Sequence, residues 1–209
     1  DVINDQRKVI YEQRNELMGL EDVQEALEDM RSGVLEALLD VYLPDEDGAQ
    51  DWDLTGLNDV YEDRFGCRLP TSMTEGVTIE RGAVLEALME GLMQQVDRLT
   101  EQCGAQTLRQ IERGVMLETL DERWKEHLAA IDHLRQGIHF RGYAQKNPAQ
   151  EFKKEAYELF QDMLTTFRQQ VVSKLALLVI EPPKSPPSLR HGSAYGAQQV
   201  TFGSSDDTE

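Results

Sequence analysis

Two amphipathic segments joined by a short loop dominate the pattern of this sequence between residues 108 and 178. In each segment apolar side chains recur at steps of three to five residues, which places them on one stripe of an α-helix. Two such stripes joined by a short loop bury each other, so they predict an antiparallel helical hairpin. The apolar positions are Leu108, Ile111, Val115, Leu120, Trp124, Leu128, Ile131, Leu134 and Ile138 in the first segment, and Phe152, Ala156, Leu159, Met163, Phe167, Val171, Leu175 and Leu178 in the second.

The structural core of this hairpin is expected where the two stripes meet. Trp124 lies in the middle of the first stripe and is expected to pack against Phe167 or against a helix outside the hairpin. Loss of a buried Trp typically costs about 3–5 kcal/mol, so this contact would matter for the whole bundle. The predicted core residues are Leu120, Trp124, Leu128, Ile131, Met163 and Phe167.

The loop of the hairpin is predicted to run from Gly137 to Pro148. Asn147 can cap the second helix, and Pro148 suits its first position. The loop combines apolar and aromatic side chains with cationic ones, whereas turn formation alone needs only small polar residues. These side chains either fold back and cap the hairpin or form a contact surface. The candidate contact residues are Ile138, His139, Phe140, Arg141, Gly142, Tyr143 and Lys146.

The rest of the chain also predicts helices, so we expect an all-α fold. Residues 1–19 form one helix, and residue 1 already lies inside its pattern, so this helix is expected to be the end of a longer one. Residues 22–43, about 57–65 and 79–102 follow as further helices, with loop-like residues 67–78 before the last of them.

Capping residues mark several of these helix ends. Thr55 and Thr78 are candidate N-caps, and Gly66 is a candidate C-cap. The apolar stripes of the two longer helices are Val23, Leu27, Met30, Val34, Leu38 and Val41, and Leu85, Leu88, Leu92, Val96 and Leu99.

The C-terminal residues 181–209 have a different composition. They begin with four prolines among residues 182–187, and the remainder lacks apolar periodicity. Proline removes a backbone donor and breaks a helix, so this stretch predicts a disordered linker or tail.

Charge is distributed unevenly along the chain, whose formal net charge is -18. Residues 20–104 contain 21 acidic and 5 basic side chains, whereas residues 109–174 contain 10 acidic and 11 basic side chains. General binding of nucleic acid needs clustered Lys and Arg, so the acidic balance argues against this function class. Anionic lipid would be repelled everywhere except at the basic hairpin tip. Solubility alone is a sufficient explanation of the acidic surface.

Recognised catalytic, nucleotide-binding and metal-binding motifs are absent from the sequence. Cys67 and Cys103 lie far apart and are expected to be free thiols. The acidic turn at residues 45–48 lacks the spacing of an EF-hand. His127 and His133 lack metal-ligand spacing and are expected on a polar face or at an interface. We therefore predict no catalytic residue, no cofactor and no metal site in this chain.

A resemblance to the SecA family of bacterial protein-translocation motors rests on two runs of residues. The run from Gly114 to Pro148, which contains Trp-Lys-Glu-His-Leu-Ala-Ala-Ile-Asp-His-Leu-Arg-Gln-Gly-Ile-His-Phe-Arg-Gly-Tyr, resembles the two-helix finger of that family. The run from Val2 to Met18, which contains Asn-Asp-Gln-Arg and Tyr-Glu-Gln-Arg-Asn-Glu-Leu, resembles the end of its long scaffold helix. Residues 20–104 resemble its helical wing in position and length.

The resemblance implies four parts in this chain. Residues 1–19 would be the end of the scaffold helix, residues 20–104 a helical wing domain, residues 105–180 the two-helix finger, and residues 181–209 a linker or tail. In the family such a linker leads to a small zinc-binding end with Cys and His ligands. No Cys follows Ile180, so we expect that end to be absent from this chain.

The resemblance also implies a function, as the non-catalytic C-terminal part of an ATP-driven motor that pushes unfolded preproteins through the SecY channel. ATP and Mg would be bound by motor domains outside this chain, and the finger would restrain ATP hydrolysis. The family's fingertip tyrosine, which touches the moving polypeptide, corresponds to Tyr143. Expected partners are SecY, unfolded preprotein and the motor domains, with an acidic lipid surface and a second copy as further candidates. The expected location is the cytoplasm, peripherally at the inner face of the cell membrane.

Two other function classes fit the same pattern. A free-standing helical chaperone or adaptor would hold partners through the hairpin without any motor. An RNA-binding protein would read bases with His139, Phe140, Arg141 and Tyr143. Binding to SecY or to a motor separates the translocation hypothesis from the adaptor, and an RNA-free, nuclease-insensitive preparation argues against the RNA-binding protein.

Overall fold

The computed structural model describes residues 2–19, 23–44, 52–74, 80–141 and 147–180. These residues contain helices and loops but no strand, which confirms the predicted all-α fold. The predicted disordered tail, residues 181–209, lies outside the described residues. The helices are α1 (Val2–Gly19), α2 (Gln24–Tyr42), α3 (Leu54–Phe65), α4 (Thr71–Thr74), α5 (Arg81–Cys103), α6 (Ala105–Arg141) and α7 (Pro148–Ala176).

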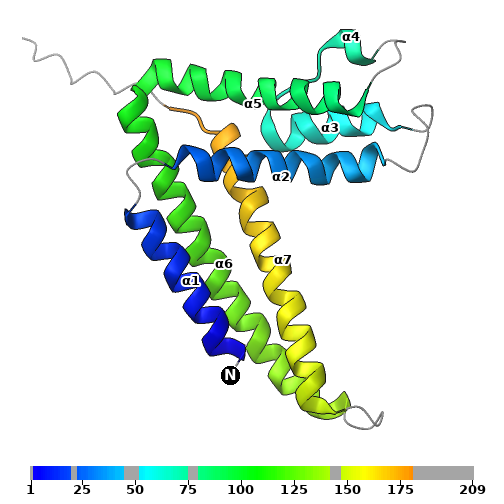
Figure 1. The fold of residues 1–209 in the computed structure, drawn as a ribbon, viewed down its shortest axis with the longest axis vertical. Coiled ribbons are helices and arrows are strands. Elements are labelled where there is room, and N and C mark those ends of the chain that lie inside the picture. Colours follow the sequence, from blue (N-terminus) through cyan, green and yellow to red (C-terminus); the bar gives the residue numbers. More distant parts are fainter. Residues whose placement is uncertain (1, 20–22, 45–51, 75–79, 142–146, 181–209) are drawn as a thin grey trace, which may run out of the picture.

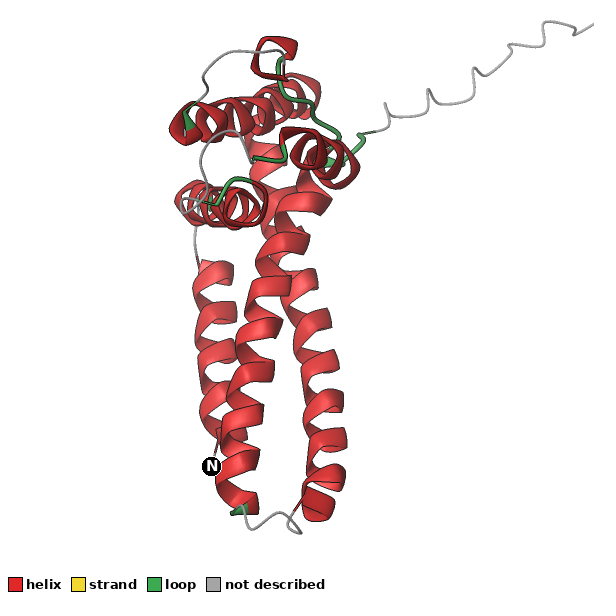
Figure 2. Ribbon diagram, turned by 90° about the vertical axis from the view of Figure 1, so that its right-hand side faces the viewer, coloured by secondary structure: helices red, strands yellow, loops and turns green. Residues whose placement is uncertain are grey.

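The longer helices fall into two groups that cross each other (Figure 1). Helices α1, α6 and α7 lie lengthwise beside one another, and we call them the hairpin bundle (Figure 2). Helices α2, α3 and α5 lie across one end of it, and we call them the crossing helices. At 1.5 Å per residue, the 37 residues of α6 span about 55 Å. The hairpin therefore has one braced end and one projecting end.

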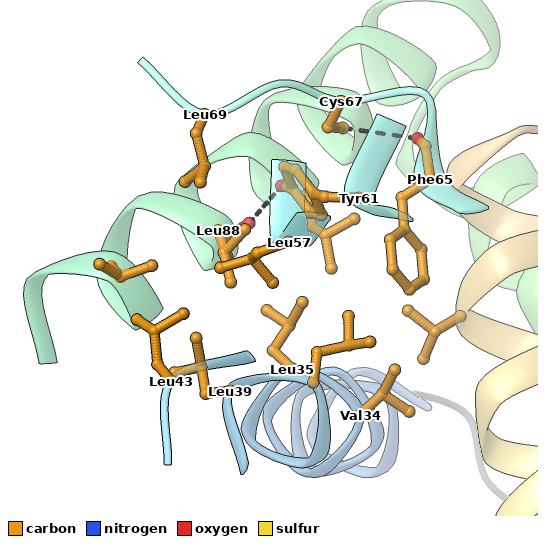
Figure 3. Packing of buried hydrophobic residues seen from close by; sticks show 14 residues of the cluster. Val34, Leu35, Leu39, Leu43, Leu57, Tyr61, Phe65, Cys67, Leu69 and Leu88 are labelled. Carbon is orange, nitrogen blue, oxygen red and sulfur yellow. Dashed lines mark hydrogen bonds between the residues drawn. The ribbon is translucent and has the colours of Figure 1, made fainter. Parts of the chain in front are cut away.

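A first hydrophobic cluster fills the space between the crossing helices (Figure 3). Tyr61 is fully buried there, and its hydroxyl donates a hydrogen bond of 2.5 Å to the carbonyl of Leu88. Helix α7 joins this cluster through Val172, which attaches the hairpin to the crossing helices. The buried residues are Val34, Leu35, Leu38, Leu39, Leu43, Leu57, Tyr61, Phe65, Cys67, Leu69, Val84, Leu88, Leu92 and Val172.

Two further clusters hold the hairpin bundle together. The second cluster joins α1, the start of α2, α6 and α7, and its buried residues are Ile10, Leu17, Val23, Leu27, Met116, Leu120, Phe160, Met163, Phe167, Val171 and Leu175. The third cluster lies toward the tip of the hairpin. Its buried residues are Ile131, Leu134, Ile138 and Ala156, with Val2, Ile3, Phe152 and Leu159 packed against them.

Several helix ends differ from the sequence prediction. Asp53, rather than Thr55, caps α3, because its carboxylate accepts a hydrogen bond of 2.8 Å from the Gly56 amide and lies favourably at the positive end of the helix dipole. Gly66 ends α3 in the left-handed conformation at φ 66°, as predicted. The short helix α4 lies within the segment predicted as a loop. The predicted cap Thr78 lies outside the described residues.

The apolar stripe predicted for α2 is correct at most positions but wrong at its last one. Val41 is 71% exposed, whereas Leu35, Leu39 and Leu43 are buried. Helix α2 packs against α3 and α5 on one side and against α7 on another, so its buried face is wider than one stripe. Position 41 lies beyond that face.

Candidate functional site

The tip of the hairpin is built by the last turns of α6 and the first turn of α7. Asn147 caps α7 by accepting a hydrogen bond of 3.0 Å from the Ala149 amide, and Pro148 is the first helical residue, as predicted. Helix α6 does not end at Gly137 but continues to Arg141, so the loop is shorter than predicted. The burial of Ile138 against α7 offsets the cost of about 1 kcal/mol for a glycine inside a helix.

Of the contact residues predicted at the hairpin tip, the structure describes some completely, some only in their backbone and some not at all. Ile138 is buried in the third cluster, where it faces inward. His139, Phe140 and Arg141 lie in the last turn of α6, and their side chains are outside the described part. The remaining members of the predicted set, Gly142, Tyr143 and Lys146, lie outside the described residues. Their role in contacting a polypeptide or a channel stays a prediction.

A cavity of about 400 Å³ lies directly beside this tip. Its walls combine apolar side chains from α1, α6 and α7 with two cationic side chains, Arg135 and Lys153. Such a surface offers apolar contact together with donors for carbonyl or carboxylate oxygens. The lining residues are Val2, Arg135, Ile138, Pro148, Ala149, Phe152 and Lys153.

A buried polar bridge connects the three helices of the bundle behind the tip. Gln6 of α1 donates a hydrogen bond of 2.9 Å from Nε2 to the carbonyl of Ala156 on α7. The Oε1 atom of Gln6 lies 2.9 Å from Nε2 of His127 on α6. Because this Gln6 oxygen can only accept, the Nε2 atom of His127 carries the hydrogen that is donated to it. One side chain therefore fixes α1 against both arms of the hairpin.

His127 is buried where α6 meets α1 and α7, so the interface, and not the polar face, is the correct one of its two expected positions. Its ring stacks on Trp124 at 5.4 Å between centroids and meets the edge of Phe160 at 5.6 Å. Burial lowers the pKa of His127 below its ordinary value of 6.5. The neutral ring is thus the form that fits between the helices.

Acid is expected to destabilise the bundle through His127. Below pH 6.5 the unfolded chain binds a proton at this side chain that the folded chain does not bind, so the free energy of unfolding falls as the pH falls. We expect His127→Gln to lose less thermal stability than the wild type between pH 7.5 and pH 5.5. Thermal melts over this range measure the difference.

The exposed His133 supplies the matched control for this titration. His133→Gln should follow the wild-type pH dependence, because its ring is not enclosed by other helices. Equal acid sensitivity of wild type and His127→Gln would show that His127 does not carry the effect.

The predicted hairpin core residues lie at different depths. Leu120, Ile131, Met163 and Phe167 are buried. Trp124 and Leu128 are half-buried, and Trp124 packs against the second cluster and the His127 ring.

Sequence reasoning missed a second group of buried polar residues, at the end of the bundle that meets the crossing helices. The carboxylate of Glu112 on α6 lies 3.6 Å from the guanidinium of Arg31 on α2, and it accepts a hydrogen bond from Arg109 one turn earlier on α6. Gln6 lies between the apolar residues of α1, and that gap is the signal by which it could have been found, whereas Glu112 lies beside the predicted stripe of α6 and gave no such signal.

A metal-binding cluster and a membrane-spanning helix are both absent from the residues that the structure describes. Within those ranges, no group of three or more His, Cys, Asp or Glu side chains is placed to hold a metal ion. None of the described helices combines the length and the apolar character needed to cross a membrane. Cys67 and Cys103 are free thiols, as predicted.

Fold and site together define an all-helical scaffold from which a long, braced hairpin projects. The sequence matches the SecA wing and scaffold domain family over residues 1–178. It is also 43% identical over 197 residues to the protein translocase subunit SecA of Nitrosococcus oceani. That match covers 91% of this chain and 21% of the relative. The chain therefore belongs to the SecA family and corresponds to its wing and scaffold region, which confirms the resemblance found in the sequence.

Proposed function

We propose that this region is the mechanical part of an ATP-driven SecA-type motor, with the hairpin tip contacting unfolded preprotein at the mouth of the SecY channel. The observation that carries this proposal is the projection of α6 and α7, with α1 alongside them, from a base that α2, α3 and α5 cross and brace. A long lever is useful only when one end is held and the other end meets a load.

The chemistry beside the tip supports a polypeptide as that load. The cavity next to Ile138 and Phe152 combines apolar walls with Arg135 and Lys153, which suits a chain of varied sequence with many carbonyl oxygens. Tyr143 adds a ring for sequence-tolerant apolar contact and one hydroxyl for hydrogen bonding, at a low entropic cost.

The bracing supports transmission of movement between the tip and the rest of the motor. Arg14 of α1 forms an ion pair of 3.0 Å with Asp121 of α6, and Lys174 of α7 lies 3.2 Å from Glu122 of α6. Both pairs are exposed and contribute little stability each, but they join the same helices as the Gln6 bridge. Movement of α1 would therefore carry the hairpin with it.

In this proposal, nucleotide binding and the contact with the membrane involve parts of the full-length protein outside this chain. Motor domains outside the chain bind ATP and Mg, and the hairpin restrains ATP hydrolysis until preprotein and SecY are engaged. Such regulation requires that the hairpin prefer one state of the motor over another. The assembly works at the cytoplasmic face of the membrane, where acidic lipid and a second copy of the protein are further candidate partners.

Tyr143→Ala in the full-length motor is expected to reduce preprotein transport strongly, because the tip loses its aromatic contact with the polypeptide. Transport into SecY-containing vesicles and ATP hydrolysis are measured in the same reactions. If the tip grips the polypeptide, transport falls more than ATP hydrolysis does.

Tyr157→Ala is the matched control, since Tyr157 is an exposed tyrosine on α7 behind the tip. It should transport at the wild-type rate. Wild-type transport by Tyr143→Ala would remove the gripping role. If this region bound neither SecY nor the motor domains, the adaptor hypothesis would replace the motor hypothesis.

A further inference from the structure

The chain turns sharply where the crossing helices meet the hairpin bundle, between α5 and α6 (Figure 1). Gly104 forms this corner with φ 81° and ψ 149°, a backbone conformation that only glycine adopts easily. A Cβ atom on Gly104 would meet nothing within 4 Å, so no neighbouring atom packs closely against the corner. The corner by itself does not fix the angle between the two groups of helices.

A buried ion cluster lies close to this corner. The Glu112 side chain is 2% exposed and the Arg31 side chain 7% exposed, and Oε1 of Glu112 lies 3.6 Å from Nη2 of Arg31. Arg109 donates to the other carboxylate oxygen from within α6. Arg31 comes from α2, so the cluster joins one crossing helix to one arm of the hairpin.

The surroundings of the cluster are mostly apolar. Arg31 and Glu112 line a small cavity together with side chains from α5, α6 and α7, among them Leu92, Leu108 and Val172. Four helices therefore meet around these two charges. Charges at such a junction restrict geometry strongly, because any rotation that separates them leaves each one buried without a partner.

The energetics indicate that the cluster serves geometry more than stability. Burial lowers the pKa of the Arg31 guanidinium even though Glu112 raises it, so the ion pair does not fully offset desolvation. Replacing a buried ion pair by well-packed apolar side chains is often neutral or stabilising. If the junction needed only stability, leucine and methionine in place of the ion pair would stabilise it at least as well.

We propose that the Arg31–Glu112–Arg109 cluster is a latch that sets the angle between the crossing helices and the hairpin bundle, with Gly104 as the hinge. With the latch closed, α2 has one orientation across α6. With the latch open, the crossing helices change their angle to the hairpin bundle about the α5–α6 corner, as far as the apolar contacts of Leu27 and Val172 with the other group of helices allow. Ser173 of α7 donates a hydrogen bond of 2.6 Å to the Arg64 carbonyl of α3, so this contact joins the hairpin bundle to the crossing helices and limits the turn to a small angle.

Distances between spin labels test this latch in the 209-residue chain. One pair joins Val41 on α2 to Tyr157 on α7, and both positions are exposed. A control pair joins Tyr11 on α1 to Tyr157, so both of its labels lie within the hairpin bundle. The labels are attached to introduced cysteines in a background with Cys67→Ala and Cys103→Ser.

Two variants open the latch in different ways. Glu112→Gln removes the negative charge with little change of shape, and the double variant Arg31→Met with Glu112→Leu replaces the pair by apolar side chains. In both we expect the Val41–Tyr157 distribution to shift and broaden while the Tyr11–Tyr157 distribution stays as in the wild type. The apolar double variant should keep or raise the thermal midpoint, so that a change of angle in it cannot come from a loss of stability. The same variant tests the latch if Glu112→Gln fails to fold.

An unchanged Val41–Tyr157 distribution in the apolar double variant would overturn the latch, because the angle would then be fixed by packing alone. Broadening of both label pairs would also overturn it, since the cluster would then stabilise the whole chain instead of one angle.

Discussion

Replacing Phe167 by alanine is expected to lower the free energy of unfolding by about 3–5 kcal/mol. Phe167 is 5% exposed and packs in the second cluster with residues of α1, α2, α6 and α7. The truncation leaves a cavity at the place where four helices meet, and long helices cannot close around it without losing their other contacts. Urea unfolding followed by helical circular dichroism measures the loss.

Tyr157→Ala is again the matched control, because Tyr157 is an aromatic residue of the same helix and is 61% exposed. Its replacement should change the free energy of unfolding by less than about 0.5 kcal/mol. A similar loss in both variants would mean that the effect comes from the helix itself, and the second cluster would not be the core of the bundle.

Much of this architecture follows from local signals in the sequence. The hairpin is predictable because its stripes are long, and the start of α7 is predictable because Asn147 and Pro148 are adjacent. The end of α3 at Gly66 is predictable because glycine favours the left-handed conformation that ends many helices. Each of these features depends on residues that are close together in the sequence, so one sequence is enough to predict it.

The position of the buried stripe on α6 was predictable only in part. Ile111, Val115 and Leu128 were predicted to be buried but are half-buried, whereas the polar neighbours Glu112 and His127 are fully enclosed. Helix α6 contacts α1 on one side, α7 on another and α5 at its start, so its buried face is set by three partners. Burial of a charge or an imidazole depends on a partner from another helix, and periodicity carries no information about that partner.

The same reason explains why the bridge and the latch escaped sequence reasoning. The partners of Gln6, which are His127 and Ala156, lie 121 and 150 positions further along the chain. The partner of Arg31, which is Glu112, lies on another helix. The tip residues are a different case from the bridge and the latch, because their role was predicted from a resemblance to the SecA family. Tyr143, the main residue of that prediction, lies outside the described residues. The function of the tip therefore remains a proposal to be tested in the whole motor.

Gly91→Ala is expected to destabilise the crossing helices by about 1–3 kcal/mol, although alanine is the better helix former. A Cβ atom at position 91 of α5 would overlap the hydroxyl of Tyr61 and would lie 3.4 Å from Cζ of the same ring. The Tyr61 ring cannot move aside, because it is fully buried and its hydroxyl is bonded to the Leu88 carbonyl (Figure 3). Gly91 is therefore the position where α3 approaches α5 too closely for a side chain.

Tyr61→Phe should rescue Gly91→Ala, because the remaining ring atoms lie 3.4 and 3.6 Å from the new Cβ, which is ordinary van der Waals contact. Tyr61→Phe alone loses one buried hydrogen bond, worth about 0.5–1.5 kcal/mol. The double variant should nevertheless be more stable than Gly91→Ala alone, since it removes the overlap and gains helix propensity. A double-mutant cycle from urea unfolding measures this coupling. Additive losses would mean that the hydroxyl is not what excludes a side chain at position 91, and that the two helices are held apart by other contacts.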